Sequence, residues 1–344
     1  MYYTKKSKEA QLHHLISSFI LLFVLIISSS IVTNAHIVYG QTNQTIAENE
    51  DLLNMQDIPL KKVYIGDIDV AYKTFGKGDP ILLIMGVTQT MDDWDPSMLQ
   101  ELSSSNHTVI IFDYRGVGNT TTGTKPFSIQ QFANDTAGLL DALKIQKTDV
   151  FGYSMGSMVA QQLALMHPEK VNRLVLVGST CGGQEGIPRS PEVEKVLSGF
   201  VNKTVNNTPI EPQELKNLIS TQLGQTWIKL HPDFLESIPE AKDLLAGIPP
   251  NTIKQQNNIV QNWFAPNWSG ICNQLPNISK PTLVITGTDD VIVPAANSLI
   301  IAGKIPGAWL VQIHGAGHAL MSQYPDEFNK VLQTFLSTTT TSPS

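Results

Sequence analysis

Short apolar segments, each closed by a glycine or a polar turn, recur along this chain and limit the folds that it can adopt. Continuous apolar runs of this length are typical of central strands that are covered on both faces. The runs are PILLIMG (80–86), HTVIIFDYRG (107–116), TDVFGYS (148–154), NRLVLVGST (172–180), PTLVITG (281–287) and AWLVQIHG (308–315). Segments with helical spacing lie among them, at 128–143, 155–167, 295–303 and 319–336. Alternating strands and helices predict an α/β fold with a mostly parallel, doubly wound sheet.

Two regions of the chain depart from this alternation. Before the first apolar run, KVYIGDIDVAYKTFG (62–76) alternates polar and apolar residues and predicts a pair of strands. Between about 184 and 279 no buried-strand run occurs, and the residues favour helices broken at Pro209, Pro232 and Pro249. A bare loop of this length is implausible in a compact domain. We therefore expect an inserted helical cap over the carboxyl ends of the strands.

The N-terminal segment is predicted to be separate from the fold. Lys5, Lys6 and Lys8 precede an uncharged apolar stretch at 15–32, and the small residue Ala35 follows it as a candidate cleavage site. Residues 1–35 are therefore interpreted as a signal peptide or a retained membrane anchor, and less favourably as a buried helix. We further expect a polar linker at 36–60, the folded domain at 61–337 and a disordered tail at 338–344.

Asparagine sequons support an extracytoplasmic protein, either secreted or anchored to the membrane. Asn-X-Ser/Thr occurs more often than chance predicts, which fits a glycosylated surface but also a general richness in Asn and Thr. The two cysteines, Cys181 and Cys272, could pair outside the cytoplasm, although the sequence does not give the distance between them. The sequon asparagines are Asn43, Asn106, Asn119, Asn134, Asn202, Asn206, Asn267 and Asn277.

Charge and spacing exclude several classes of function. The net charge is −7, and no basic run follows the first few residues, which argues against nucleic-acid binding. No Cys/His ligand spacing occurs, so a structural metal site is not expected.

The pentapeptide GYSMG (152–156) joins an apolar run to a segment with helical spacing. This strand–turn–helix context is the one that a nucleophile elbow requires. Gly152 and Gly156 lack the Cβ atoms that would collide where strand and helix cross, and the bend exposes the Ser154 hydroxyl. We therefore interpret Ser154 as a nucleophile and not as a simple turn residue.

A serine nucleophile needs a histidine base and a carboxylate that orients it. The last strand run is followed by His314 and His318, and the preceding one by Asp289 and Asp290. We favour His318 as the base and Asp290 as the acid, in the chain order Ser, Asp, His that this motif leads us to expect. The alternative for either aspartate is a turn or a helix cap.

The negative oxygen of a tetrahedral intermediate needs two donors. The backbone N–H of Met155, directly after the nucleophile, is predicted to provide one of them. The N–H of Val87, in the turn after the first apolar run, is predicted to provide the other.

Five motifs in this order give the chain a specific resemblance. They are LLIMGVTQTMDDW (82–94), FDYRGVGNT (112–120), GYSMGS (152–157), GTDDVIVP (287–294) and GAGH (315–318). From about residue 62 to 337 the chain resembles the α/β-hydrolase fold superfamily, and within it esterase, haloperoxidase-like and enol-lactonase-like enzymes. The resemblance implies that Asp290 is the acid and His318 the base. It also implies that Asp113 and Arg115 are structural. Met85-Gly86 departs from the family's frequent His-Gly at the oxyanion turn.

Aromatic residues in the expected cap have two interpretations. Trp227, Trp263, Phe264 and Trp268 either line an apolar substrate pocket or form the core of the cap. Trp94 is expected to pack near the oxyanion loop.

These features predict a serine hydrolase that cleaves a small carboxylic ester or lactone through an acyl-enzyme. No metal or cofactor is expected. The alternative is a ligand-binding protein on the same scaffold with little turnover. The natural substrate and the oligomeric state stay open.

Overall fold

The computed structural model describes residues 53–236 and 248–338. The predicted signal or anchor segment, most of the predicted linker, the sequon at Asn43 and almost all of the predicted tail lie outside the described residues. Among the described residues, no helix has both the length and the apolar character needed to cross a membrane.

Eight strands form one sheet, in the order β1-β2-β4-β3-β5-β6-β7-β8. β1 and β2 pair antiparallel, β2 pairs antiparallel with β4, and every other neighbouring pair is parallel. The sheet thus confirms the predicted mostly parallel α/β fold. The strands are β1 (Lys61–Ile65), β2 (Ile68–Gly76), β3 (Asp79–Ile84), β4 (His107–Phe112), β5 (Thr148–Tyr153), β6 (Val171–Val177), β7 (Thr282–Gly287) and β8 (Trp309–Ile313).

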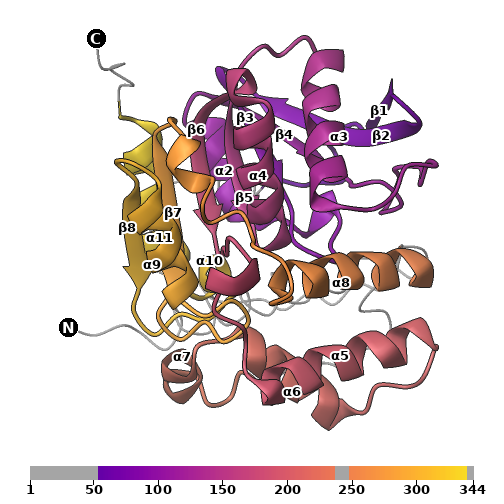
Figure 1. Ribbon diagram of the computed structural model, residues 1–344, viewed down its shortest axis with the longest axis vertical. Helices are drawn as coiled ribbons and strands as arrows, with labels where there is room; N and C mark the ends of the chain where they lie inside the picture. The colour runs from indigo at the N-terminus through magenta and orange to yellow at the C-terminus, as the bar shows by residue number, and fades with distance from the viewer. Residues whose placement is uncertain (1–52, 237–247, 339–344) are drawn as a thin grey trace, which may run out of the picture.

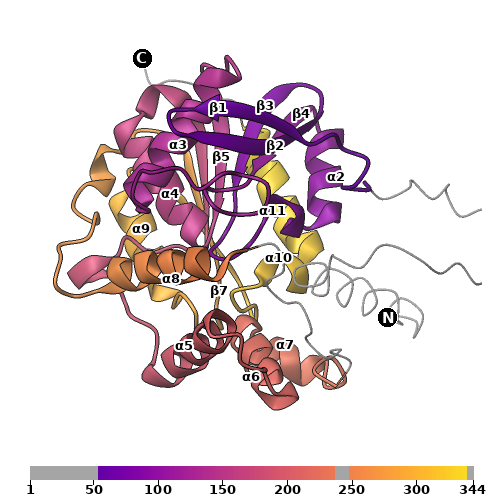
Figure 2. The ribbon, with the colours of Figure 1, turned by 90° about the vertical axis from the view of Figure 1, so that its right-hand side faces the viewer.

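Helices cover both faces of this sheet. α3 (Ile129–Ala142), α4 (Met155–Met166) and α9 (Ala296–Lys304) cover one face, and α2 (Pro96–Ser104) and α11 (Pro325–Leu336) the other (Figure 2). Strand β3 shows why its apolar run is continuous: Leu82 and Ile84 enter the first core, whereas Ile81 and Leu83 enter the second. Each such fully buried side chain stabilises the fold by about 1.5–3 kcal/mol.

Helix boundaries agree with the sequence pattern except at two places. The segment 319–336 is divided into α10 (Leu320–Gln323) and α11 because Pro325 excludes Tyr324 from helical backbone angles. Helix α2 was not predicted. Asp95 nevertheless caps it, accepting a hydrogen bond from the Met98 N–H, and Pro96 occupies its first position.

The insertion between β6 and β7 is helical, and it lies beyond the carboxyl ends of the parallel strands (Figure 1). Its helices are α5 (Pro191–Val205), α6 (Pro212–Gln222), α7 (Gln225–Leu230) and α8 (Pro250–Phe264). We call these four helices and their connections the cap. Short 3₁₀ turns complete the fold at Met91–Asp93, Pro168–Lys170, Gly183–Glu185 and Leu275–Asn277.

A disulfide joins the two segments that connect the cap to the sheet. Cys181 follows β6, Cys272 precedes β7, and their Cα atoms are 5.0 Å apart. The Ile271 N–H also donates a hydrogen bond to the Cys181 carbonyl at 3.0 Å. Both ends of the cap are thus fastened together at its base.

The folded domain begins earlier than the predicted boundary at residue 61. Met55 and Ile58, assigned to the linker from sequence, are buried in the core on the α2 and α11 face. The Lys73 ammonium donates a hydrogen bond to the Met55 carbonyl at 2.8 Å. The prediction was wrong for this part of the linker because two well-spaced apolar residues in a polar segment do not form a recognisable pattern.

Candidate active site

Ser154 lies at the sharp bend between β5 and α4. Its backbone has φ 53° and ψ −121°, a strained conformation for a residue with a side chain. A Cβ atom on Gly152 would lie 2.5 Å from the Gly156 carbonyl oxygen, and one on Gly156 would lie 1.9 Å from the Ile84 carbonyl oxygen. Both glycines of the pentapeptide are therefore required by the close passage of strand and helix.

The side chains of Ser154, His318 and Asp290 form one hydrogen-bonded row. His318 Nε2 lies 2.9 Å from Ser154 Oγ, and His318 Nδ1 lies 2.8 Å from Asp290 Oδ2. The other carboxylate oxygen of Asp290 accepts hydrogen bonds from the N–H groups of Ile292 and Val293, both at 2.9 Å. These bonds fix the carboxylate, which in turn fixes the tautomer and orientation of the imidazole.

The two alternative residues point elsewhere. Asp289 accepts a hydrogen bond from the Thr226 N–H at 2.9 Å and so holds α7 of the cap. His314 is exposed. Gly178 makes room for the imidazole, because a Cβ atom there would lie 2.8 Å from His318 Cε1.

The turn after β3 lies against the serine. A Cβ atom on Gly86 would lie 3.4 Å from Ser154 Cβ, and Val87 lines the same cavity as Ser154. Met155 is the first residue of α4, so the helix provides no internal acceptor for its N–H. The N–H groups predicted to bind an oxyanion thus come from two segments that flank Ser154.

Two side chains hold this turn in the absence of the family's frequent histidine. The Tyr114 hydroxyl donates a hydrogen bond to the Met85 carbonyl at 2.9 Å. Gln256 Oε1, from cap helix α8, accepts a hydrogen bond from the Thr88 N–H at 2.8 Å. Thr88 has φ 56°, so this bond supports an unfavourable left-handed conformation directly after Val87.

A cavity of about 160 Å³ opens above Ser154 and His318, between the sheet and the cap. Both its apolar and its polar lining residues come from the two sides. The cap contributes Arg189, Leu197, Phe200, Val201, Leu218, Gln222, Asn257 and Val260, and the rest of the domain contributes Met85, Val87, Thr88, Gln89, Asp93, Trp94, Asp95, Tyr153, Ile292, Ala319, Met321 and Ser322.

The four cap aromatics are not among the residues that line this cavity, and their contacts support the second of their two interpretations, packing within the cap. Trp227 packs on His231 and Phe234 inside the cap. Trp263 is buried at the base, where its indole N–H donates a hydrogen bond to the Thr180 carbonyl. Two further residues serve this packing: Trp268 lies against Trp263, and Phe264 lies under Arg189. The physical reason is that α8 is buried on more than one side, and Val260 instead of Trp263 is directed to the cavity.

Buried carboxylates support the loops around the cavity. Burial raises the pKa of Asp93 to about 7, although it accepts a hydrogen bond from the Thr90 N–H at 2.6 Å. Burial also raises the pKa of Asp113 to about 6, and this side chain accepts a hydrogen bond from the Met91 N–H. Arg115 binds Asp135 through two hydrogen bonds away from the cavity. Asp113 and Arg115 therefore have the structural roles that the resemblance implies.

Several cavity residues were missed by the sequence analysis, above all Arg189 and Gln256. A lone arginine or glutamine in a helical insertion carries no motif, and only the pairing of the cap with the sheet reveals its position. Across residues 53–236 and 248–338, no group of three or more His, Cys, Asp or Glu side chains is arranged to hold a metal ion.

Comparison with known proteins agrees with this arrangement. The family model described as the alpha/beta hydrolase fold matches residues 79–324. This match confirms the resemblance that the five motifs indicate.

Three similar proteins show the range of activities around this chain. A protein of Azorhizobium caulinodans, named as a candidate carbamate hydrolase (RutD), is 29% identical over 272 residues, which cover 78% of this chain and 96% of the relative. The structure of Est816, an N-acyl homoserine lactone degrading enzyme, has 26% identity and a TM-score of 0.62, and it covers 80% of this chain and 100% of that one. A thermophilic esterase from Thermogutta terrifontis has 25% identity and a TM-score of 0.64, covering 80% and 98%.

Proposed function

The chain belongs to the α/β-hydrolase fold family of hydrolases, and we propose that it is a serine hydrolase that cleaves a carboxylic ester or lactone through an acyl-enzyme. One observation carries this proposal: the Ser154 hydroxyl, the His318 imidazole and the Asp290 carboxylate are joined by hydrogen bonds of 2.9 and 2.8 Å at the wall of a cavity.

The hydrogen-bonded row of Ser154, His318 and Asp290 supports an acylation step in which proton transfer accompanies the attack on the substrate carbonyl. His318 Nε2 takes the proton from Ser154 Oγ as that oxygen bonds to the substrate carbonyl carbon. Asp290 stabilises the imidazolium that forms, and His318 then returns the proton to the departing alcohol oxygen. Water next attacks the acyl-enzyme, with His318 again acting as the base, and the acid product leaves.

In both steps a tetrahedral intermediate with a negatively charged oxygen forms. We place this oxygen between the N–H groups of Val87 and Met155. The partial positive charge at the N-terminus of α4 adds to this stabilisation. Such donors contribute most when they are already oriented before the reaction, which is the condition that the Thr88–Gln256 bond supports.

The similar proteins support an acyl substrate. One is a lactone-degrading enzyme and another is an esterase, each at 25% identity or above. A lactone is an internal ester, so the same attack opens it.

The test uses p-nitrophenyl acetate and butyrate together with a fluorophosphonate probe that reacts with activated serines. We expect turnover of at least one ester and labelling of one site, both abolished in Ser154→Ala. If the wild-type protein is folded but shows neither labelling nor turnover, the proposal fails and a ligand-binding role on this scaffold is favoured.

We also propose that the protein works outside the cytoplasm. The Cys181–Cys272 disulfide is consistent with an oxidising compartment. The sequon asparagines that fall within the described residues, from Asn106 to Asn277, are all exposed. The mass of the protein purified from its native cell envelope or medium, before and after deglycosylation, tests this proposal; an unmodified mass that retains residues 1–35 on a protein from the cytoplasmic fraction would contradict it.

A further inference from the structure

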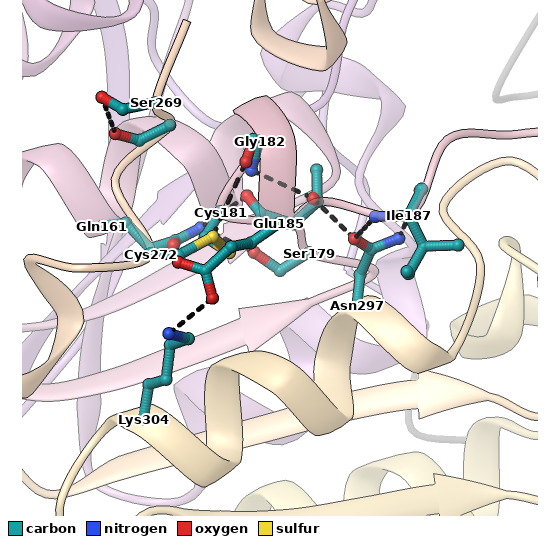
Figure 3. Close-up of a disulfide and its surroundings, with 12 residues drawn as sticks. Gln161, Ser179, Cys181, Gly182, Glu185, Ile187, Ser269, Cys272, Asn297 and Lys304 are labelled. Carbon is teal, nitrogen blue, oxygen red and sulfur yellow. Dashed lines mark hydrogen bonds and ion pairs between the residues drawn. A yellow bond between two sulfur atoms is a disulfide. The ribbon is translucent and has the colours of Figure 1, made fainter. Parts of the chain in front are cut away.

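The segment between β6 and the first cap helix α5 is held unusually firmly at its backbone. Asn297, at the start of α9, is fully buried, and its amide makes two hydrogen bonds to Ile187: Oδ1 accepts from the N–H and Nδ2 donates to the carbonyl, both at 2.8 Å. Figure 3 shows these contacts together with the disulfide and with the ion pair between Glu185 and Lys304. Arg189 follows two residues later, so its starting point is fixed relative to the sheet.

The Arg189 side chain is itself held in one orientation. Its guanidinium carbon lies 4.7 Å from the centre of the Phe264 ring, and its Nε lies 3.3 Å from Glu194 Oε2. Glu194 is fixed in turn, because its Oε1 accepts a hydrogen bond of 2.6 Å from Gln261 on α8. Only 9% of the Arg189 side chain is exposed. A buried, stacked guanidinium loses little rotamer freedom when it binds a further partner.

Phe264 contacts one face of the guanidinium, and Glu194 binds its Nε edge. The two terminal nitrogens take part in neither contact. No side chain or carbonyl of the described residues accepts a hydrogen bond from them, although Arg189 lines the cavity that holds Ser154. Burial lowers the pKa of this guanidinium, and the negative charges of Glu194 and Asp290 partly offset the effect. A largely buried charge is stabilised by a partner, and the terminal edge of the guanidinium can take a planar, two-oxygen acceptor.

We propose that the natural substrate is an ester or lactone that also carries a carboxylate, and that this carboxylate binds the terminal nitrogens of Arg189 while Ser154 attacks the carbonyl. This inference rests on the proposed hydrolase function and names the substrate class for the same cavity. The same cavity is also lined by apolar residues such as Phe200 and Val260, which suit a short hydrocarbon spacer.

The other charges of the cavity are compatible with an anionic group at Arg189. Asp93 and Asp95 belong to the loop after β3, whereas Arg189 belongs to the cap. Asp93 is already bound to the Thr90 N–H, and its raised pKa reduces its negative charge near neutral pH. Glu194 is directed at Nε and at Gln261, so the terminal nitrogens are not shielded by its carboxylate.

The experiment compares monomethyl esters of succinic to pimelic acid with neutral isosteres in which the free carboxylate is a methyl ketone. Release of acid is followed for the wild-type protein, Arg189→Met, Arg189→Lys and the control Lys195→Met, which removes an exposed cation from α5. We expect the wild type to prefer one carboxylated ester over its isostere by about 30-fold in kcat/KM, as for a hydrogen-bonded ion pair. Arg189→Met should lose this preference through KM, while Lys195→Met keeps it.

The controls separate this inference from the proposed function and from a merely structural arginine. Fluorophosphonate labelling of Ser154 should persist in Arg189→Met, and kcat/KM should fall by a larger factor for the carboxylated esters than for the neutral ones, whereas a structural role would lower both by the same factor. If Arg189→Met does not fold, inhibition of the wild type by monomethyl glutarate and by its neutral isostere methyl 5-oxohexanoate decides in its place, with the carboxylated ester expected to compete more strongly. Equal or better turnover of the neutral isosteres, with Ser154 still labelled, would overturn the substrate class and leave the hydrolase standing.

Discussion

Two helices near the cavity differ sharply in how they are packed: α4, which begins directly after Ser154, and α5, which lines the cavity from the cap. Ten of the twelve residues of α4 are buried, whereas none of the fifteen residues of α5 is. α4 begins directly after the nucleophile and lies among the strands and helices of the domain, while α5 lies in the cap, outside the sheet (Figure 1). The catalytic side chains therefore belong to the core of the domain. The cap, which is packed less tightly, is expected to contact the parts of the substrate that do not react.

This difference implies a division of roles that substitutions can test. Changes at the rim of the sheet, where Ser154, Asp290 and His318 lie, should affect the reaction or the stability of the fold. Changes in the cap should mostly affect which substrate is accepted. Residues that bridge the two regions should show effects of intermediate size.

The largest effect is expected at the rim, from the pair of adjacent aspartates. Asp290→Asn should lower kcat by about 10⁴-fold, because an amide cannot hold the imidazole in the tautomer that accepts the serine proton. Asp289→Asn should lower it less than about 10-fold, since Asp289 only anchors Thr226 of the cap. Steady-state kinetics on p-nitrophenyl butyrate measures both, and comparable losses in the two variants would contradict the assignment of the acid.

A second pair compares one glycine from each region. In Gly156→Ala the new Cβ would lie 1.9 Å from the Ile84 carbonyl oxygen, so strand and helix must separate and the free energy of unfolding should fall by more than about 4 kcal/mol. Gly199, inside α5, has no neighbouring atom within 4 Å of the place that a Cβ atom would occupy, and Gly199→Ala should raise stability by about 0.5–1 kcal/mol.

Urea unfolding followed by circular dichroism measures both variants, and the slope of the transition tests whether the same surface is exposed. A stable Gly156→Ala protein would mean that the elbow is not constrained as tightly as its contacts indicate. A Gly199→Ala protein that loses stability would mean that the outer face of α5 is covered after all.

The contrast between the two regions also explains what could be predicted from the sequence. The strands and the elbow follow from local patterns: a continuous apolar run means a strand covered on both faces, and GYSMG between a strand and a helix leaves one geometry. The roles of Asp290 and His318 are predicted from their positions directly after the last two strands. Each of these signals is contained in a few neighbouring residues.

The sequence predicts that the cap is helical, but it carries no local signal for the direction that each cap side chain takes. Large aromatics such as Trp227 and Trp263 suit either an apolar pocket or the core of the cap, because a helix has several faces and packing decides which face each residue takes. Arg189 and Gln256 act through partners that are 5 to 168 residues away along the chain, Glu194 and Thr88. Only the assembled structure brings these partners together.

The smallest of the three effects is expected at Gln256, the residue that links the two regions. Its amide oxygen holds the Thr88 N–H, and Thr88 directly follows the proposed oxyanion donor Val87. Gln256→Leu keeps the volume of the buried side chain but removes the acceptor, so the Val87 N–H should lose its fixed direction. We expect kcat to fall about 10-fold with KM nearly unchanged, because the loss concerns an interaction made mainly in the transition state.

Two variants on the same position and the same helix make this prediction specific. Gln256→Glu retains an acceptor for the Thr88 N–H and should recover most of the lost kcat, whereas Asn258→Ala, on the exposed side of α8, should leave kcat unaltered. Kinetics on neutral and carboxylated esters measures all three variants. A drop in kcat/KM confined to KM would place Gln256 with the substrate-selecting cap, and no change at all would show that Tyr114 alone holds the turn. The expected result, a lower kcat caused by a change in the cap, would mean that the cap also helps to orient the oxyanion donor Val87.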